Sequence, residues 1–298
     1  MSSQKRISKA YENARRVSFN DHSKFIIFSD CHRGDNSFAD EFANNRNIYF
    51  HALEHYYKEG FSYCELGDGD ELWENLTFQS IFEAHQNVFE LLRKFYAENR
   101  SYRLIGNHDM VYKNEKYVEK NLFSYFNKVT GKDDPLFPEI TFTEGLVLKH
   151  EKTGQEIFML HGHQADWLNY HGWKFNRFLV RALWQPLQVF GIGDPTSPAR
   201  NYKELIKVER RTKKWIVDND NIFTITGHTH RPRFPEPGDI AYFNDGSCVH
   251  PRSITGLEIE NGEISLVKWN ISTTEDGTLK VVRLLLEGPQ KLIDYKTE

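Results

Sequence analysis

The chain has 298 residues, of which 39% are hydrophobic and 27% charged, and its formal net charge is -4. This length is enough for one large domain or two small ones, and the negative charge argues against stable binding of nucleic acid. The sequence has no apolar run of about 18 residues, no apolar secretory segment at its start and no spaced pair among its three cysteines, so we expect a cytoplasmic enzyme without a transmembrane segment.

In chain order, a short outer helix is expected within residues 1–18. Five apolar runs then end in polar residues: KFIIFSD, YCELGD, YRLIGNHD, IFMLHGH and IFTITGHTH. Short β-branched runs of this kind predict buried strands. Apolar residues recur at helical spacing between the first three runs, in NNRNIYFHALEHYYKEG and LTFQSIFEAHQNVFELLRKFYAE. The alternation predicts an α/β fold, in which ligands gather at the carboxyl ends of strands.

The second half is richer in strands than in helices. It contains TEGLVLKH, IAYFNDGS, TGLEIEN and ISLVKWN, with hairpin turns expected at Asn261-Gly262 and Asp276-Gly277. We expect this half to build a second sheet packed on the first. The tail after Asn270 would be a further hairpin or an interface element.

Residues 164–220 separate two of the predicted strands and have mostly helical patterns. Pro186 and the loop GIGDPTSPAR interrupt them, and NYKELIKVERRTKKWIV follows as a second helix. We interpret this segment as a helical cap inserted over the strand ends of a single domain spanning residues 1–298.

Carboxylate, imidazole and amide side chains follow the predicted strands. Oxygen and nitrogen ligands suit Mn²⁺, Fe²⁺ or Zn²⁺. In the D-x-H and H-x-H patterns two side chains leave an extended backbone on the same side, which suits chelation. The set is too large for one ion, but two ions about 3.5–4 Å apart with a bridging carboxylate would use it. The residues are Asp30, His32, Asp68, Asn107, His108, Asp109, His161, His163, His228 and His230.

The blocks SDCHRGD, ELGDGDE, LIGNHD, LHGH and TGHTH, in this order, resemble the five signature blocks of the calcineurin-like metallophosphoesterases. The resemblance covers about residues 24–250. It implies an α/β fold, a four-layer α/β/β/α sandwich of two mixed sheets. It also implies two metal sites that share Asp68: the first formed by Asp30, His32, Asp68 and His230, the second by Asp68, Asn107, His161 and His228.

The same resemblance implies a mechanism. Two divalent ions, Mn²⁺ with Fe²⁺ or Zn²⁺ as alternatives, would bridge a hydroxide that attacks phosphorus in line. His108 would stabilise the phosphoryl oxygens and the leaving group, and Asp109 would orient His108. Glu71 would support the site or begin a helix rather than take part in catalysis.

Within the superfamily, the layout is most similar to the UDP-diacylglucosamine pyrophosphohydrolases. The similarity lies in Asp68, Glu71, Trp73 and the helical cap, although those enzymes usually have Arg where His108 stands. A cap narrows access to the metals, so we expect a small phosphodiester, pyrophosphate or phosphomonoester, nucleotide- or lipid-linked. Candidate substrate contacts are Arg33, His163, Lys174, Arg177 and Arg181.

Other interpretations remain open at this point. Arg33 could form a surface ion pair, His163 could only support a metal ligand, and the cap side chains could only pack the cap on the body. A phosphoprotein phosphatase and a catalytically inactive scaffold are the alternative functions. The sequence does not decide the oligomeric state.

Overall fold

The computed structural model describes residues 1–166, 170, 172 and 202–296. The helices and 3-10 turns are α1 (Ser3–Glu12), η1 (Glu41–Asn44), α2 (Arg46–Lys58), α3 (Phe78–Ala84), α4 (Gln86–Ala97), η2 (Met110–Lys113), α5 (Glu115–Leu122), η3 (His163–Ala165), α9 (Tyr202–Asp218) and η5 (Leu292–Tyr295). The strands are β1 (Arg15–Phe19), β2 (Phe25–Phe28), β3 (Ser62–Glu65), β4 (Ser101–Arg103), β5 (Ser124–Asn127), β6 (Lys132–Pro135), β7 (Gly145–His150), β8 (Glu156–Leu160), β9 (Phe223–Thr226), β10 (Tyr242–Asn244), β11 (Ser253–Glu260), β12 (Glu263–Thr273) and β13 (Leu279–Lys291).

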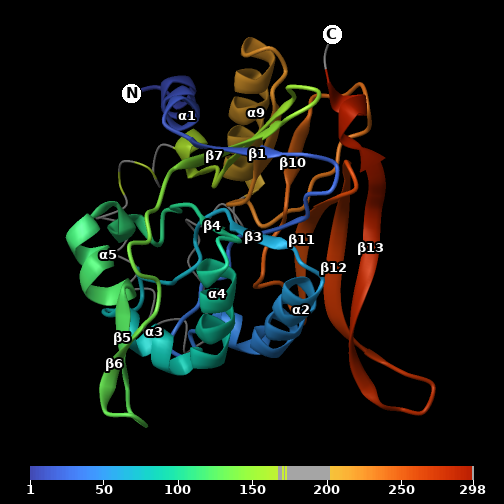
Figure 1. The fold of residues 1–298 in the computed structure, drawn as a ribbon. Coiled ribbons are helices and arrows are strands. Elements are labelled where there is room, and N and C mark those ends of the chain that lie inside the picture. The colour runs from blue at the N-terminus through green and yellow to red at the C-terminus, as the bar shows by residue number, and fades with distance from the viewer. Residues whose placement is uncertain (167–169, 171, 173–201, 297–298) are drawn as a thin grey trace.

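Two large mixed sheets form the body (Figure 1). One has the strand order β1-β7-β8-β9-β10, and the other has the order β13-β12-β11-β2-β3-β4. In the second sheet β2, β3 and β4 run parallel, whereas β11, β12 and β13 pair antiparallel. Strands β5 and β6 form a separate small hairpin.

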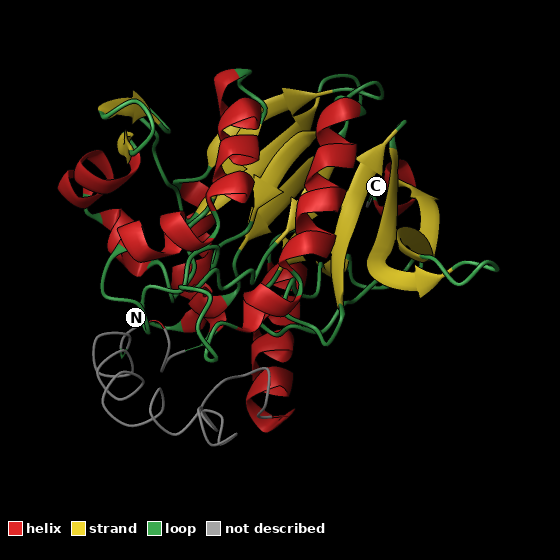
Figure 2. Ribbon diagram, turned by 90° about the horizontal axis from the view of Figure 1, so that it is seen from below, coloured by secondary structure: helices red, strands yellow, loops and turns green. Residues whose placement is uncertain are grey.

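Alternation along β2 shows how the layers form. Phe25 and Ile27 point into the hydrophobic cluster between the two sheets, and Ile26 and Phe28 point into the cluster under α2 and α4. Side chains in a strand alternate between faces, so a strand of four buried residues must be covered on both sides. The helices that provide this cover are seen across the strands in Figure 2.

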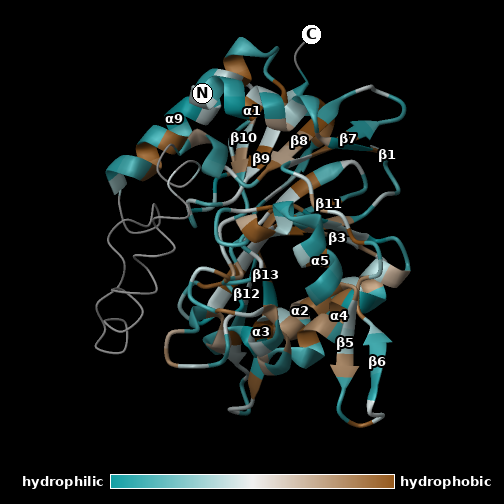
Figure 3. Cartoon of the chain, turned by 90° about the vertical axis from the view of Figure 1, so that its left-hand side faces the viewer, coloured by the Kyte–Doolittle hydropathy of each residue, from teal (hydrophilic) through white to brown (hydrophobic). Residues whose placement is uncertain are grey.

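Helices α1 and α9 cover the outer face of the five-stranded sheet. Ile7 of α1 and Trp215 of α9 pack with Phe158 of β8 in one buried cluster. Figure 3 shows hydrophobic and hydrophilic stretches alternating along α9, as expected of a helix with one face on a sheet. The order helix, sheet, sheet, helix confirms the predicted four-layer α/β/β/α class of two mixed sheets.

The division of the strands between the two sheets differs from the prediction. We expected each half of the chain to build its own sheet, but β11, β12 and β13 extend the sheet that contains β2, β3 and β4. Residues 1–18 form not only the expected helix but also most of β1, which pairs parallel with β7. The long helical pattern after residue 76 is two helices, α3 and α4, which meet at His85.

Both predicted hairpin turns are present. Residues Asn261 and Gly262 have φ of 56° and 71° and connect β11 to β12. The tail after Asn270 belongs to the long β12–β13 hairpin, which turns at Gly277. Of the predicted cap, α9 is described, but residues 173–201 lie outside the described part of the chain. No helix in the described ranges is long and apolar enough to cross a membrane.

Candidate metal centre

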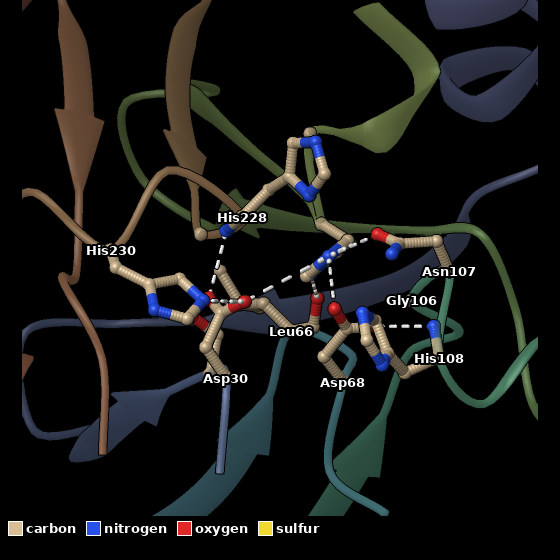
Figure 4. A network of polar contacts seen from close by, with 12 residues as sticks. Asp30, Leu66, Asp68, Gly106, Asn107, His108, His228 and His230 are labelled. Carbon is tan, nitrogen blue, oxygen red and sulfur yellow. Dashed lines mark hydrogen bonds and ion pairs between the residues drawn. The ribbon is translucent and has the colours of Figure 1, made fainter. Parts of the chain in front are cut away.

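Two groups of carboxylates and imidazoles lie together at the carboxyl ends of β2, β3, β8 and β9 (Figure 4). In each group the potential ligand atoms lie within 4.8 Å of one another. The first group is Asp30, His32 and His230, and the second is Asp68, His161 and His228. Strands β2 and β3 are parallel, and so are β8 and β9. The carboxyl ends of parallel strands lie at the same end of the sheet, so residues from distant parts of the sequence meet there.

Asp30 is the buried centre of the first group. Its Oδ1 lies 3.1 Å from Nε2 of His230 and 3.8 Å from Nε2 of His32. Its Oδ2 accepts a hydrogen bond from the backbone N–H of His228 at 2.8 Å. Burial alone would raise the pKa of Asp30, but His230 and His161 outweigh it and hold the pKa well below its usual range. Asp30 is therefore an ionised carboxylate.

Asp68 connects the two groups. Its Oδ2 lies 3.2 Å from Nε2 of His161 and 3.8 Å from Nε2 of His32. Nε2 of His161 also lies 3.2 Å from Oδ1 of Asn107. Nδ1 of His161 lies 2.9 Å from the carbonyl oxygen of Leu66 and donates to it, so Nε2 is the ring nitrogen that faces the group. The geometry brings six of the seven predicted ligands into the two groups and places Asn107 beside the second.

The residues fit a divalent cation. Three buried side-chain atoms of these groups have no hydrogen-bond partner among the described residues: Oδ1 of Asp30, Nε2 of His32 and Nε2 of His228. Buried polar atoms that lack a hydrogen bond are costly, and these three make ion-pair contacts instead, with one another or with His230, Asp68 and Asp166. Burial would lower the pKa of His161, but Asp68 and Asp30 outweigh it and raise the pKa to about 9. Such a site favours positive charge.

The backbone is strained at five of the predicted ligands. The φ angles are 50° at Asp30, 47° at His32, 50° at Asp68, 66° at His228 and 54° at His230. Residues other than glycine seldom adopt positive φ, at a cost of about 1–3 kcal/mol each. Strain concentrated on one set of side chains is typical of a functional site.

Glycine is required beside Asp68. A Cβ at Gly106 would lie 2.0 Å from Oδ1 of Asp68. That same oxygen accepts the backbone N–H of His108 at 2.8 Å. The block LIGNHD thus carries a glycine because its backbone lies directly against the shared carboxylate.

His108 lies at the edge of the groups with its ring held on three sides. It stacks on Trp73 at 4.1 Å between centroids and lies edge-on to His32 at 4.6 Å. Its Nδ1 lies 2.8 Å from Oε1 of Glu71, and Nδ1 of His32 lies 2.8 Å from Oε2 of the same carboxylate. Glu71 therefore links a predicted metal ligand to the predicted catalytic imidazole.

The prediction that Asp109 orients His108 differs from the structure. The carboxylate of Asp109 accepts the backbone N–H of Gly69 at 2.9 Å and of Gly106 at 2.6 Å. These bonds tie together the loops after β3 and β4. Burial and then the charge of Asp68 raise the pKa of Asp109 to about 7. Glu71 holds the His108 ring instead, because its side chain reaches Nδ1 whereas that of Asp109 points to the loops.

Arg33 is neither a substrate contact nor a surface ion pair. It is fully buried, with Nε 2.8 Å from Asp70 and Nη1 2.7 Å from Glu65. Arg103 bonds the same two carboxylates at 2.9 and 2.7 Å. Four charged side chains thus form a closed network beneath the loop that carries Asp68, which we call the Arg33 network.

His163 is buried beside the second group. Its ring lies 5.4 Å from that of His161 and stacks on Tyr170 at 5.7 Å. Neither of its nitrogens has a hydrogen-bond partner within the described residues, so a contact with substrate stays a prediction. The other predicted contacts, Lys174, Arg177 and Arg181, lie outside the described residues.

Several supporting residues were missed by sequence reasoning. The hydroxyl of Ser29 lies 2.5 Å from Oδ2 of Asp30 and 2.8 Å from Oδ1 of Asp245. Asn244 donates to the carbonyl of Gly227 at 2.7 Å and so fixes the turn before the last two histidines. Asn244 is the last residue of β10, and Asp245 follows it. The rule that ligands gather at the carboxyl ends of strands would have found them.

The chain matches no protein-family model and no curated protein. Among solved structures, it is similar to Vps29 of Chaetomium thermophilum, with 12% identity, a TM-score of 0.36, and coverage of 90% of this chain and 97% of that one. It is also similar to Vps29 of Entamoeba histolytica complexed with Zn²⁺, with 16% identity, a TM-score of 0.37, and coverage of 89% and 99%. Similarity at this level assigns no activity.

Glu71→Gln tests the link between His32 and His108. Glutamine keeps the shape of the glutamate side chain. Its NH₂ group, however, would replace one of the two carboxylate oxygens and would face Nδ1 of either His32 or His108. For the phosphodiester hydrolysis that the sequence predicts, we expect kcat/KM to fall about 10–100-fold, as for other residues that orient metal ligands. The measurement is steady-state hydrolysis with metal content determined in parallel. The exposed Glu119→Gln is the matched control and should be unchanged. A variant as active as wild type would refute the role of Glu71.

Proposed function

We propose that the protein is a dinuclear metal-dependent phosphohydrolase of the calcineurin-like superfamily. The observation that carries the proposal is the joining of the two ligand groups through Asp68 and His32. Nε2 of His32 lies 3.8 Å from Oδ1 of Asp30 and 3.8 Å from Oδ2 of Asp68. Two adjoining sites that share a carboxylate are typical of two-metal hydrolases.

The proposed ligands divide between the two sites. One ion would be held by Asp30, His32, Asp68 and His230, and the other by Asp68, Asn107, His161 and His228. Bound divalent ions supply Lewis acidity to phosphoryl oxygens and make a nucleophile available from water near neutral pH. These ligands would accept Mn²⁺, Fe²⁺ or Zn²⁺, and we propose Mn²⁺ as the ion to test first.

The chain contributes His108 as the group facing the phosphoryl oxygens. Its side chain is 21% exposed, whereas the side chains of Asp30 and His161 are completely buried. Burial would lower the pKa of His108, but Glu71 and Asp68 outweigh it and raise it. A protonated imidazole held by Glu71 and Trp73 could stabilise developing negative charge or donate a proton to a leaving oxygen.

The proposed substrate class is the one expected from the sequence, without the finer assignment to one branch of the superfamily. We propose a small phosphodiester, pyrophosphate or phosphomonoester, because the cap predicted within residues 164–220 would narrow access. The UDP-diacylglucosamine branch is not part of the proposal. Its support came from Asp68, Glu71, Trp73 and the predicted cap, of which residues 173–201 lie outside the described part of the chain. In addition, His108 stands where those enzymes usually have Arg.

The test compares bis-p-nitrophenyl phosphate with p-nitrophenyl phosphate after chelation and after adding back Mn²⁺. We expect the diester to be cleaved faster, with activity falling at least about 100-fold on chelation and returning with metal. Faster cleavage of the monoester would direct the search to sugar phosphates and phosphoproteins. Absence of both bound metal and turnover would overturn the proposal in favour of an inactive scaffold.

A further inference from the structure

Strand β4 forms the edge of the six-stranded sheet opposite to β13 (Figure 1). A groove runs along this edge. The cavity has a volume of about 700 Å³. It is lined by β4, by parts of residues 135–143, by parts of residues 93–99 at the end of α4, and by Arg15 of β1 and Leu146 of β7. None of the proposed metal ligands lines it. We call this cavity the β4 groove. Cavities of about 300–1,000 Å³ are typical of binding sites.

The backbone edge of β4 that faces the groove is largely unpaired. Toward β3, Tyr63 donates to the carbonyl of Arg100, and Leu104 donates to that of Glu65. In a parallel pair this pattern turns the N–H groups of Ser101 and Arg103 and the carbonyl of Ser101 outward. No backbone partner for these three groups is present among the described residues. Unpaired edge groups are a template for another strand.

The groove closes at one end. Beyond Arg103, Leu104 and Thr143 form an isolated parallel bridge, and Ile105 donates to the carbonyl of Thr143 at 2.9 Å. Residues 135–141 diverge from β4 and leave the cavity between them and the strand. Thr143 therefore pairs with the chain just after β4, whereas the edge of β4 itself stays open.

The rim of the β4 groove is basic in an acidic protein. Arg15, Arg93 and Lys94 line it, and Glu139 is the single acid among the described lining residues. Arg103 also lines the groove, but it is committed to the Arg33 network. The whole chain has a net charge of -4, so the rim is a local excess of positive charge. A partner with acidic side chains would complement it.

The walls of the β4 groove are apolar and aromatic. Leu136 and Ile140 are buried, and the guanidinium of Arg15 lies 4.9 Å from the ring centroid of Tyr102. The hydroxyl of Tyr96 donates to the carbonyl of Pro138 at 2.5 Å, and Tyr96 lines the groove. An extended segment with alternating apolar and acidic side chains would match this groove, because its apolar side chains could contact the walls and its acidic side chains could pair with the basic rim.

We propose that the β4 groove binds an extended acidic and apolar segment of a partner protein, which adds to the sheet beside β4. Main-chain bonds would supply part of the affinity, and the basic rim with the aromatic walls would supply the selectivity. This function is separate from the metal centre and does not depend on it.

The first experiment measures fluorescence anisotropy of a fluorescein-labelled hexapeptide of alternating Glu and Leu. We expect the 298-residue chain to bind it and to bind a peptide of alternating Lys and Leu at least tenfold more weakly. The double variant Arg15→Glu/Lys94→Glu should weaken binding at least tenfold. Lys58→Glu/Lys280→Glu, with the same charge change at exposed positions outside the groove, should stay within twofold. Circular dichroism melts confirm that each variant is folded.

A second pair of peptides separates strand addition from simple anion binding. All Glu amides of a strand point to one edge and all Leu amides to the other. N-methylation of one set should therefore abolish binding, while methylation of the other set should leave it within a few fold. Equal effects of both sets, no binding of the acidic peptide, or full binding by Arg15→Glu/Lys94→Glu would overturn the proposal.

Discussion

Asp68→Asn should lower metal-dependent phosphodiester hydrolysis by about 10³-fold or more. Asparagine keeps the size and one oxygen, so the N–H of His108 can still be accepted, but the negative charge shared by both sites is lost. Metal ions contribute several kcal/mol of transition-state stabilisation, and each 1.36 kcal/mol is about tenfold in rate. We expect kcat to fall and bound metal to drop below two ions per chain.

The control for this variant is Asp35→Asn, an aspartate in the exposed part of the loop after His32. It should retain wild-type activity and metal content. Thermal melts in chelator should show that Asp68→Asn is folded, because the variant removes a buried charge rather than a packing group. An Asp68→Asn protein that keeps two ions and more than a tenth of wild-type kcat would contradict the shared role of Asp68.

Arg33→Met should destabilise the fold by about 3–5 kcal/mol. Arg33 is completely buried and pairs with Glu65 and Asp70, so its removal leaves buried carboxylates with only Arg103 to compensate them. Breaking a buried charge network from one side costs about this much. The measurement is urea unfolding at pH 7. Where the variant is still folded, KM should be close to wild type, because Arg33 does not reach the site surface.

The matched control is Arg16→Met. Arg16 pairs with Glu156 at 3.2 Å, but its side chain is 46% exposed. Exposed ion pairs contribute about 0–1 kcal/mol, so we expect a loss of no more than this. Equal losses from Arg33→Met and Arg16→Met would show that the Arg33 network is not a major source of stability.

The same network predicts a dependence on pH. Burial would raise the pKa of Glu65, but Arg103 and Arg33 outweigh it and lower it from 4.5 to about 2. A carboxylate with a lowered pKa in the folded state adds stability that is complete above pH about 4.5 and is lost as the pH falls toward 2. The difference in unfolding free energy between wild type and Arg33→Met should therefore shrink between pH 5 and pH 3. A difference that stays constant over this interval would count against an ionised Glu65.

The sequence alone predicted the local parts of the structure. Runs such as KFIIF and IFTIT become buried strands because their apolar residues have no alternative to a covered sheet. Ligands such as Asp30 and His228 could be named because they directly follow those strands, and parallel strands bring such positions to one edge. The order of the five blocks then determined which polar residues belonged together.

Only the tertiary structure decided where individual side chains point. Asp109 follows His108 directly, whereas Glu71 lies 37 residues earlier in the chain. The loop packing nevertheless directs Asp109 to Gly69 and Gly106 and brings Glu71 to the imidazole ring. Arg33 follows a predicted ligand, yet it turns into the interior because Glu65 and Asp70 lie there.

The sheet order also depended on contacts far apart in the chain. Strand β1 pairs with β7, about 130 residues later, and β2 pairs with β11 at the far end of the sequence. Neither partner is marked by local periodicity, because a strand pattern states which faces are buried but not which strand lies alongside. The sequence pattern therefore determines which residues are the candidate metal ligands. Packing between distant parts of the chain determines which strands pair and which side chains hold those ligands in place.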